Sequence, residues 1–279
     1  MANMRYFATL FIVTIFVGCG ETPTSHLAEE FPIIRSGPHD MEFAFILKGA
    51  FRMGSPESEE GRTYYNERLH WVKLTEDYWM QTTEVTVGQW LKVMTDYPSS
   101  DDEKCWRTNG VSKEDDHPVL CVKWDDAMAF VNALNRKEKN SGYKYSLPTE
   151  AQWEYAARGY TESAYSIDGP LDSFAWFGFS SYGWTHMVGS LKANFFGLYD
   201  VHGHASEWVL DFLEKEYPKA NSVSDAVEDP TGPKEGESHV LRGGSWISLA
   251  RACRSANREK FDSFRGNITN GFRLVRTKR

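Results

Sequence analysis

Alternating apolar and polar residues mark the first regular elements of the chain. Phe43, Phe45 and Leu47 occupy every second position before Gly49, and this period of two predicts a half-buried strand with the three side chains on one face. A second alternating run over residues 72–79 predicts another strand. We therefore expect the folded domain to begin at residue 43.

Helical periodicity follows in three places. Residues 89–94 come after a threonine-rich turn and predict a short helix. Apolar residues recur at helical spacing behind two aspartates and predict a helix over 125–139. Thr149, with Gln152 three residues later, predicts the N-cap of a third helix that ends at Gly159. Beyond that glycine, turn and aromatic residues predict short strands at most.

The first 18 residues are typical of an export signal. Arg5 precedes an apolar run over residues 7–17, which is too short to span a bilayer but has the length of a signal-peptide core. The run ends in small residues before Cys19, as in signals whose cysteine is acylated and becomes the mature N-terminus. An ordinary secretory signal followed by an unrelated cysteine is the alternative.

A lipid anchor would place the chain in the cell envelope. Residues 19–42 contain three prolines and predict a tether that holds the domain at 43–279 off the membrane surface. Gly20 follows the cysteine where an aspartate would favour retention in the inner membrane, so we expect the outer membrane if the cell has one.

Composition and charge narrow the classes of partner. Hydrophobic residues make up 41% of the chain and aromatic residues 14%, which suffices for a packed core. The formal net charge is −8, without a stripe of lysine and arginine. Since phosphate binding requires such a stripe, nucleic acid is not expected as a partner.

Export to an oxidising compartment makes the remaining cysteines informative. If Cys19 carries lipid, Cys105, Cys121 and Cys253 remain. Cys105 and Cys121 would close a loop of about 15 residues and stabilise the fold by ~3 kcal/mol, so we predict this disulfide. Cys253, between two arginines, is either a thiol activated by the neighbouring positive charges or a buried, inert cysteine.

Several segments occur in an order that resembles the formylglycine-generating enzyme family, whose members are also called sulfatase-modifying factors. The segments are 49–55, 83–86, 117–127, 147–159, 194–208, 242–246 and 271–273. The resemblance extends from about residue 43 to the C-terminus. It implies an α+β, C-type-lectin-like fold with little regular secondary structure.

The block at residues 194–208 has the composition of a calcium site. Asp200 and Glu207 flank a glycine turn, so carboxylate and backbone oxygens can meet at one centre, as Ca²⁺ requires. The resemblance implies that the side chains of Asp200 and Glu207 and the main-chain carbonyls of Gly203 and Ala205 bind calcium. A loop held by hydrogen bonds alone is the alternative.

The residues that the family uses for catalysis are incomplete. A formylglycine-generating enzyme oxidises a substrate cysteine with two active-site cysteines that bind copper, an ion for which soft thiolates are suited. The corresponding stretch, 246–258, contains Cys253 alone, so copper is not expected. The related iron enzymes require three histidines. The histidines here lack metal-site spacing and are His117, His186, His202, His204 and His239.

Three functions remain open at this point. We favour a binding module in which the lectin-like scaffold is kept and residues 247–270 form a surface for an envelope protein, peptide or glycan. Residues 242–275 also resemble the variable tails of retroelement-diversified proteins. The candidate ligand surface consists of Trp246, Ile247, Ser248, Leu249, Phe261 and Phe264. Its apolar side chains fit an exposed surface or a core equally well. The alternatives are an oxidase or divergent oxygenase that uses Cys253 with another ligand, and a purely structural envelope role.

Overall fold

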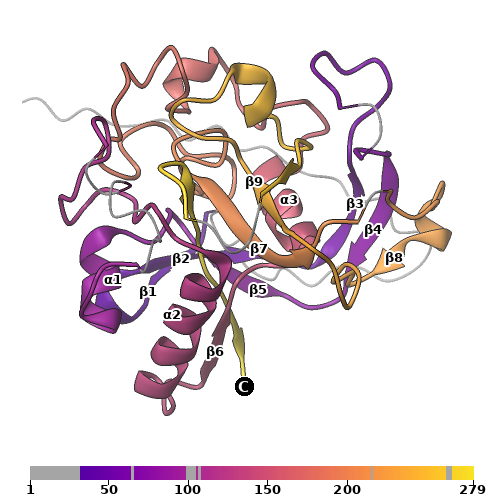
Figure 1. The fold of residues 1–279 in the computed structure, drawn as a ribbon. Coiled ribbons are helices and arrows are strands. Elements are labelled where there is room, and N and C mark those ends of the chain that lie inside the picture. Colours follow the sequence, from indigo (N-terminus) through magenta and orange to yellow (C-terminus); the bar gives the residue numbers. More distant parts are fainter. Residues whose placement is uncertain (1–31, 64–65, 99–104, 106–107, 215, 262–265) are drawn as a thin grey trace, which may run out of the picture. The chain divides into compact units, whose positions relative to one another are not determined.

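Short elements joined by long connections characterise the computed structural model, which describes residues 32–279 apart from 64–65, 99–104, 106–107, 215 and 262–265. Cys19, Phe264 and the predicted signal lie outside the described residues. Within those residues, no helix is long and apolar enough to cross a membrane. Helices and strands both occur, and the strands form mixed sheets, which confirms the predicted α+β class (Figure 1).

The largest sheet joins the start of the described chain to its end. Its strands lie in the order β1, β2, β5, β12, β6. Their bounds, in that order, are Ile34–Ser36, Glu42–Ile46, Tyr78–Gln81, Val275–Lys278 and Tyr143–Ser146. Neighbouring strands are antiparallel, and the C-terminal strand β12 lies between β5 and β6. The sheet is therefore complete only when both ends of the domain have folded.

A second sheet contains the end of the predicted calcium block. Its strands lie in the order β10, β9, β7, β11 and span Glu259–Lys260, His239–Arg242, Ser206–Phe212 and Asn270–Gly271. β7 is antiparallel to β9 and parallel to β11. A small third sheet, at the right of Figure 1, has the order β3, β4, β8 and spans Gly49–Met53, His70–Leu74 and Val227–Glu228.

The three predicted helices are confirmed with small shifts at their ends. The bounds are Val87–Met94 for α1, Trp124–Lys137 for α2 and Glu150–Arg158 for α3. Thr86 with Gln89, and Thr149 with Gln152, form reciprocal capping boxes at the starts of α1 and α3. Gly159 ends α3 in the left-handed region, which glycine adopts without steric cost.

Apolar side chains form separate clusters on the two faces of β2. Phe43 is buried in the cluster that includes residues of α1 and α2, whereas Ala44 and Ile46 are buried in the cluster that includes residues of α3. Phe45 is partly buried against the first cluster. The predicted strand is thus present, with Phe43 and Phe45 on one face, but it ends at Ile46 and is not half-buried, because the chain covers both of its faces.

Three other boundaries differ from the prediction. The alternating run over 72–79 is divided between β4 and β5, and the backbone amide of Thr75 in the intervening turn donates to Asp229. β1 pairs with β2, so the folded domain begins before residue 43 and the tether is shorter than expected. β7 has seven residues, longer than the short strands predicted after Gly159. The Thr75 turn and β7 depend on distant parts of the chain, whereas β1 pairs with the neighbouring strand β2.

Candidate functional site

Glu207, one of the two predicted calcium carboxylates, is fully buried in an ion pair. Its Oε2 accepts from Arg273 Nε at 2.7 Å and from Trp153 Nε1 at 2.8 Å, and its Oε1 accepts from Arg273 Nη2 at 2.7 Å. Both oxygens are thus occupied and the charge is neutralised by a guanidinium group. Glu207 holds β7 to the segment that precedes β12. The sequence predicted a calcium ligand at this position, and the structure shows an ion pair instead.

Asp200, the other predicted carboxylate, lies in a buried group with Glu84 and His204. One oxygen, Asp200 Oδ2, accepts from the Gly189 amide at 2.7 Å, and Glu84 Oε1 accepts from the Ala205 amide at 3.2 Å. The other two oxygens, Asp200 Oδ1 and Glu84 Oε2, are buried without a hydrogen-bond partner. Such orphaned anionic oxygens are costly, and a bound cation would satisfy them.

His204 lies beside these carboxylates, and its Nδ1 is also buried without a hydrogen-bond partner. Its Nε2 accepts from the His186 amide at 3.1 Å, so Nε2 carries the lone pair and Nδ1 carries the proton. Nδ1 lies 3.3 Å from Glu84 Oε1 and 4.0 Å from Asp200 Oδ2. We therefore assign the cation-binding atoms to the two carboxylates and a supporting role to the imidazole.

The group of Asp200, Glu84 and His204 has an unusual pKa and an unusual backbone conformation. Burial, and secondly the charge of Glu84, raise the pKa of Asp200 to about 6, because the two carboxylates lie close together with little solvent. Asp200 and His204 adopt φ values of 60° and 69°, which residues other than glycine rarely hold. Strained backbone of this kind is concentrated at binding sites.

The calcium implied by the family fits the carboxylate oxygens of this group. Glu84 precedes α1 and would replace Glu207 as the second acidic ligand beside Asp200. Hard carboxylate oxygens are the donors that Ca²⁺ prefers. Gly203 packs directly against the backbone carbonyl of Trp176, and the Ala205 amide already donates to Glu84, so both residues shape the wall of the site. Calcium binding itself stays a prediction.

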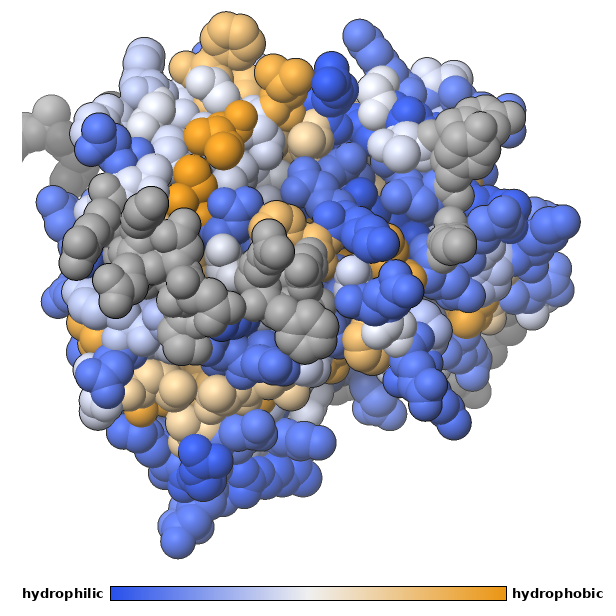
Figure 2. All heavy atoms as spheres, in the orientation of Figure 1, coloured by the Kyte–Doolittle hydropathy of each residue, from blue (hydrophilic) through white to orange (hydrophobic). Residues whose placement is uncertain are grey.

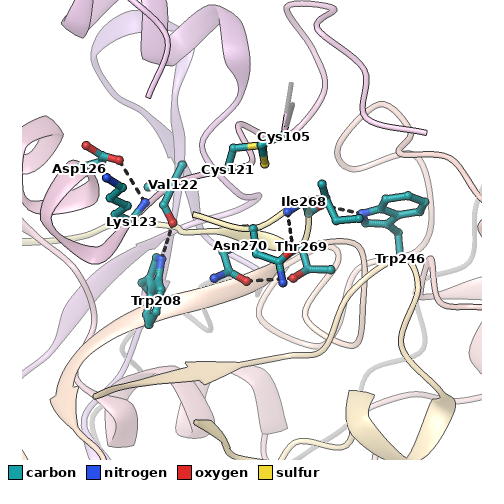
Figure 3. The surroundings of a disulfide bond; sticks show 11 residues. Cys105, Cys121, Val122, Lys123, Asp126, Trp208, Trp246, Ile268, Thr269 and Asn270 are labelled. Carbon is teal, nitrogen blue, oxygen red and sulfur yellow. Dashed lines mark hydrogen bonds between the residues drawn. A yellow bond between two sulfur atoms is a disulfide. The ribbon is translucent and has the colours of Figure 1, made fainter. Parts of the chain in front are cut away.

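The predicted disulfide between Cys105 and Cys121 is present, with the two Cα atoms 6.0 Å apart. Figure 3 shows it beside the segment that carries Ile268 and in the neighbourhood of Trp246. The two cysteines form a small core cluster with Trp246, against which Ile268 packs. The bridge thus supports the base of the candidate ligand segment.

Cys253 is buried, which decides between the two interpretations of its thiol. Its side chain is fully enclosed and its Sγ lies 3.7 Å from the carbonyl oxygen of Leu249. Burial, and secondly the charge of Glu259, raise the pKa of the thiol well above its ordinary range. The flanking arginines do not activate it, since Arg254 pairs with Glu59 and Glu67. Cys253 is an inert core residue.

Within the described part of the chain, no cluster of potential metal ligands contains three histidines. Among the described residues, the clusters of potential metal ligands are Glu84 with Asp200 and His204, and Glu114 with Asp116 and His117. Each contains a single histidine. The second cluster lies at the surface, where acidic groups commonly occur without an ion.

Two members of the predicted ligand surface are structural instead. The indole of Trp246 is buried and its Nε1 donates to the carbonyl of Ile268 at 2.9 Å. Phe261 packs against the core, with its ring centroid 6.3 Å from that of Trp208. Ser248 is half-buried and its hydroxyl lies 2.9 Å from that of Ser245.

The other two described members of the predicted ligand surface, Ile247 and Leu249, are exposed. Three exposed aromatic residues that were not predicted from the sequence accompany them. Ile247 and Leu249 are each 50% exposed. Phe179 and Tyr182 are each 81% exposed and Trp184 is 57% exposed. The dense run of aromatic residues over 176–184 is the sequence feature from which they could have been predicted. We call these five residues the apolar rim: Phe179, Tyr182, Trp184, Ile247 and Leu249.

Backbone contacts bring the two segments of the apolar rim together. The Gly178 amide donates to the Ser248 carbonyl at 2.8 Å, and an added Cβ at Gly178 would lie 3.0 Å from the same oxygen. Figure 2 shows apolar residues gathered at the top of the molecule, over the upper loops of Figure 1. An apolar surface of this kind, built on held loops, is typical of a recognition site.

Known proteins share this architecture and parts of this sequence. Residues 35–278 match the family described as sulfatase-modifying factor enzyme 1-like domain. Serine/threonine-protein kinase pkn1 of Chlamydia caviae is 29% identical over 262 residues, which cover 90% of this chain and 40% of the kinase. Chaperone protein LppX of Paenibacillus barcinonensis is 28% identical over 252 residues, covering 72% of this chain and 81% of the chaperone. The solved structure of Treponema denticola variable protein 1 aligns with a TM-score of 0.70 and 27% identity, over 88% of this chain and 99% of that chain.

Proposed function

Since this chain belongs to the family of sulfatase-modifying factor enzyme 1-like domains, we propose that it is a non-catalytic member that binds a protein or peptide in the cell envelope. The apolar rim is the contact surface of this proposal. A lipid on Cys19 would anchor the chain in the outer membrane. The domain would then face the periplasm or the cell exterior.

The exposure of the apolar rim carries the proposal. Aromatic side chains lose large apolar area from water when they are covered, and they contribute strongly at protein contacts while losing few rotamers. Phe179 and Tyr182 are each 81% exposed, more than any other large hydrophobic side chain among the described residues. The LppX relative is named a chaperone, a function that consists of binding protein chains.

Cysteine chemistry argues against the oxidase alternative. The chain has four cysteines. Cys105 and Cys121 are joined to each other, Cys253 is enclosed, and Cys19 precedes the described domain. A copper site of the family type requires two thiolates at one accessible place. The described domain offers no second free thiol near Cys253.

A capture experiment tests the proposed surface. The oxidised chain from residue 20 onward would be immobilised and exposed to envelope extract, alongside the variant Tyr182→Ser/Trp184→Ser/Ile247→Ser. Val223→Ser is the matched control, because Val223 is also about half exposed but lies in a separate 3-10 turn. We expect the control to retain a captured protein that the triple variant loses.

A direct titration completes that test. The captured protein would be purified and added to each chain while tryptophan fluorescence is recorded. Binding that weakens at least about tenfold in the triple variant supports the apolar rim as the contact, as hot-spot side chains account for this much. Equal binding by wild type and triple variant would show that the surface is assigned wrongly.

The enzymatic alternative has its own measurement. The chain would be titrated with copper(I) and mixed with a cysteine-containing peptide while O₂ uptake and peptide mass are followed. We expect no stoichiometric copper binding and no formylglycine. Stoichiometric copper together with peptide oxidation would replace the binding proposal by an oxidase.

A further inference from the structure

A second candidate site lies away from the apolar rim, in a cavity of about 280 Å³ beside the start of α3. Residues of the small third sheet, of α3 and of the segment after β7 contribute to its wall. Its apolar side chains include Met53, Phe212, Val227 and Pro230. The cavity therefore has room and apolar surface for a short aliphatic chain.

Hydrogen-bond acceptors predominate among the polar groups of this wall. Asp211 is 4% exposed, and its Oδ2 accepts from the Glu150 amide at 2.8 Å. His70 Nδ1 lies 2.9 Å from the carbonyl of Arg68 and must carry a proton there, so Nε2 keeps a lone pair. The hydroxyl of Tyr217, a residue 6% exposed, is buried, and its oxygen has lone pairs that can accept a hydrogen bond. A ligand that donates hydrogen bonds would match this wall.

The charge balance of the wall is negative. Arg258 donates from Nε and Nη2 to the two carboxylate oxygens of Glu150, at 2.7 Å and 2.8 Å, and its guanidinium lies 4.1 Å from the centre of the Tyr217 ring. Its charge is thus compensated by Glu150. Burial lowers the pKa of His70, which keeps the imidazole neutral near pH 7. Asp211 and Glu214 are the remaining acidic residues of the wall, so carboxylates outnumber cationic groups there.

We propose that this cavity binds a primary ammonium group carried on a short aliphatic chain, with Asp211 as its counter-charge. The ammonium group supplies three donors for Asp211, Tyr217 Oη and His70 Nε2, and the aliphatic chain covers the apolar side chains. A free alkylamine and the side chain of a lysine in a peptide share this chemistry. The site is independent of the apolar rim and of the cation group at Asp200.

Calorimetric titration with n-pentylamine tests the site on the intact chain. At pH 8 the amine is protonated, because alkylammonium groups titrate near pH ~10, and Asp211, whose pKa burial raises to about 7, is ionised. We expect saturable binding of n-pentylamine and at least about tenfold weaker binding of n-pentanol, which has the same chain without the charge. Equal binding of the two compounds, or no saturable binding of the amine, would overturn the proposal.

Two variants locate the binding in the cavity. Asp211→Asn keeps an oxygen that can accept from the Glu150 amide but removes the charge, so it should weaken amine binding at least about tenfold. Tyr217→Phe removes one hydrogen-bond acceptor of the wall and should weaken amine binding less. Unchanged amine affinity in a folded Asp211→Asn chain would refute the site, and if that variant does not fold, the comparison of amine with alcohol on the wild type decides. A lysine peptide capped at both ends, titrated in parallel, distinguishes a peptide ligand from a free amine.

Discussion

The residues that the family resemblance assigns to calcium do not all lie where an ion could bind. Glu207 and Arg273 form a buried bidentate ion pair, and Glu84 joins Asp200 in the group that sequence spacing assigned to Glu207. The sequence identified the acidic residues near position 200 but could not show which carboxylate would be neutralised. That depends on Arg273, which reaches the site from the other end of the chain.

The thiol of Cys253 provides the first prediction. Because it is enclosed and its pKa is raised by burial, we expect it not to react with a thiol reagent such as dithionitrobenzoate at pH 8 in the native chain from residue 20. Unfolding without reductant should release one reactive thiol. Rapid labelling of the native chain, read from the absorbance of the released thionitrobenzoate, would contradict the burial and reopen the question of reactivity.

Asp211 provides a pH prediction. Burial, with the charge of Glu150, raises its pKa from 3.8 to about 7, so between these values the native chain binds more protons than the unfolded chain. The free energy of unfolding must then decrease as pH rises through this window. We expect the stability of the wild type relative to Asp211→Asn to fall between about pH 4 and pH 7, measured by urea unfolding. A pH-independent difference between the two chains would contradict the shift.

Elements with local signals were predicted well, and elements defined by distant pairing were not. The capping boxes at Thr86 and Thr149 and the glycine at the end of α3 lie within a few residues of the helices they delimit. By contrast, the turn between β4 and β5 is bonded to Asp229, and β7 pairs with β9 and β11. The alternation of apolar and polar residues does not identify such distant partners, so the division of the second predicted strand and the length of β7 could not be predicted from it.

The disulfide supplies a prediction for the ligand segment. Replacing both Cys105 and Cys121 by serine should lower the free energy of unfolding by ~3 kcal/mol, because the unfolded chain regains the freedom of the closed loop. Since Trp246 packs in the same cluster, its fluorescence should also shift towards that of a solvated indole. The measurement is denaturant unfolding followed by tryptophan emission. An unchanged midpoint and emission spectrum would show that the bridge does not support this segment.

At the scale of the whole molecule, the anchor and the domain can be separated. Cys19→Ser should leave the chain without acyl mass and move it from the detergent phase to the aqueous phase on partitioning, while the melting temperature of the domain stays unchanged. The reason is that the predicted acylation site precedes the described residues of the domain. Phase partitioning and intact mass give the readout. A wild-type mature chain that begins at another residue and lacks lipid would contradict the anchor.

Calcium at the predicted site would link residues from distant parts of the domain, so its effect should appear in global unfolding. Glu84 precedes α1 and Asp200 precedes β7, and an ion held by their orphaned oxygens would bind the native state alone. Calcium at about a hundred times its Kd should then raise the free energy of unfolding by ~2.7 kcal/mol, and magnesium much less.

Three variants distinguish this calcium site from the one expected from the sequence. Asp200→Asn and Glu84→Gln should each abolish the calcium-dependent rise in melting temperature. Glu207→Gln should keep that rise while lowering stability by ~3–5 kcal/mol, because it leaves the buried Arg273 without its partner. Calorimetry with and without EDTA measures both effects. If EDTA leaves the wild-type melting curve unmoved and elemental analysis finds no calcium, the two carboxylates are held by His204 and backbone amides alone, and the ion assignment is wrong.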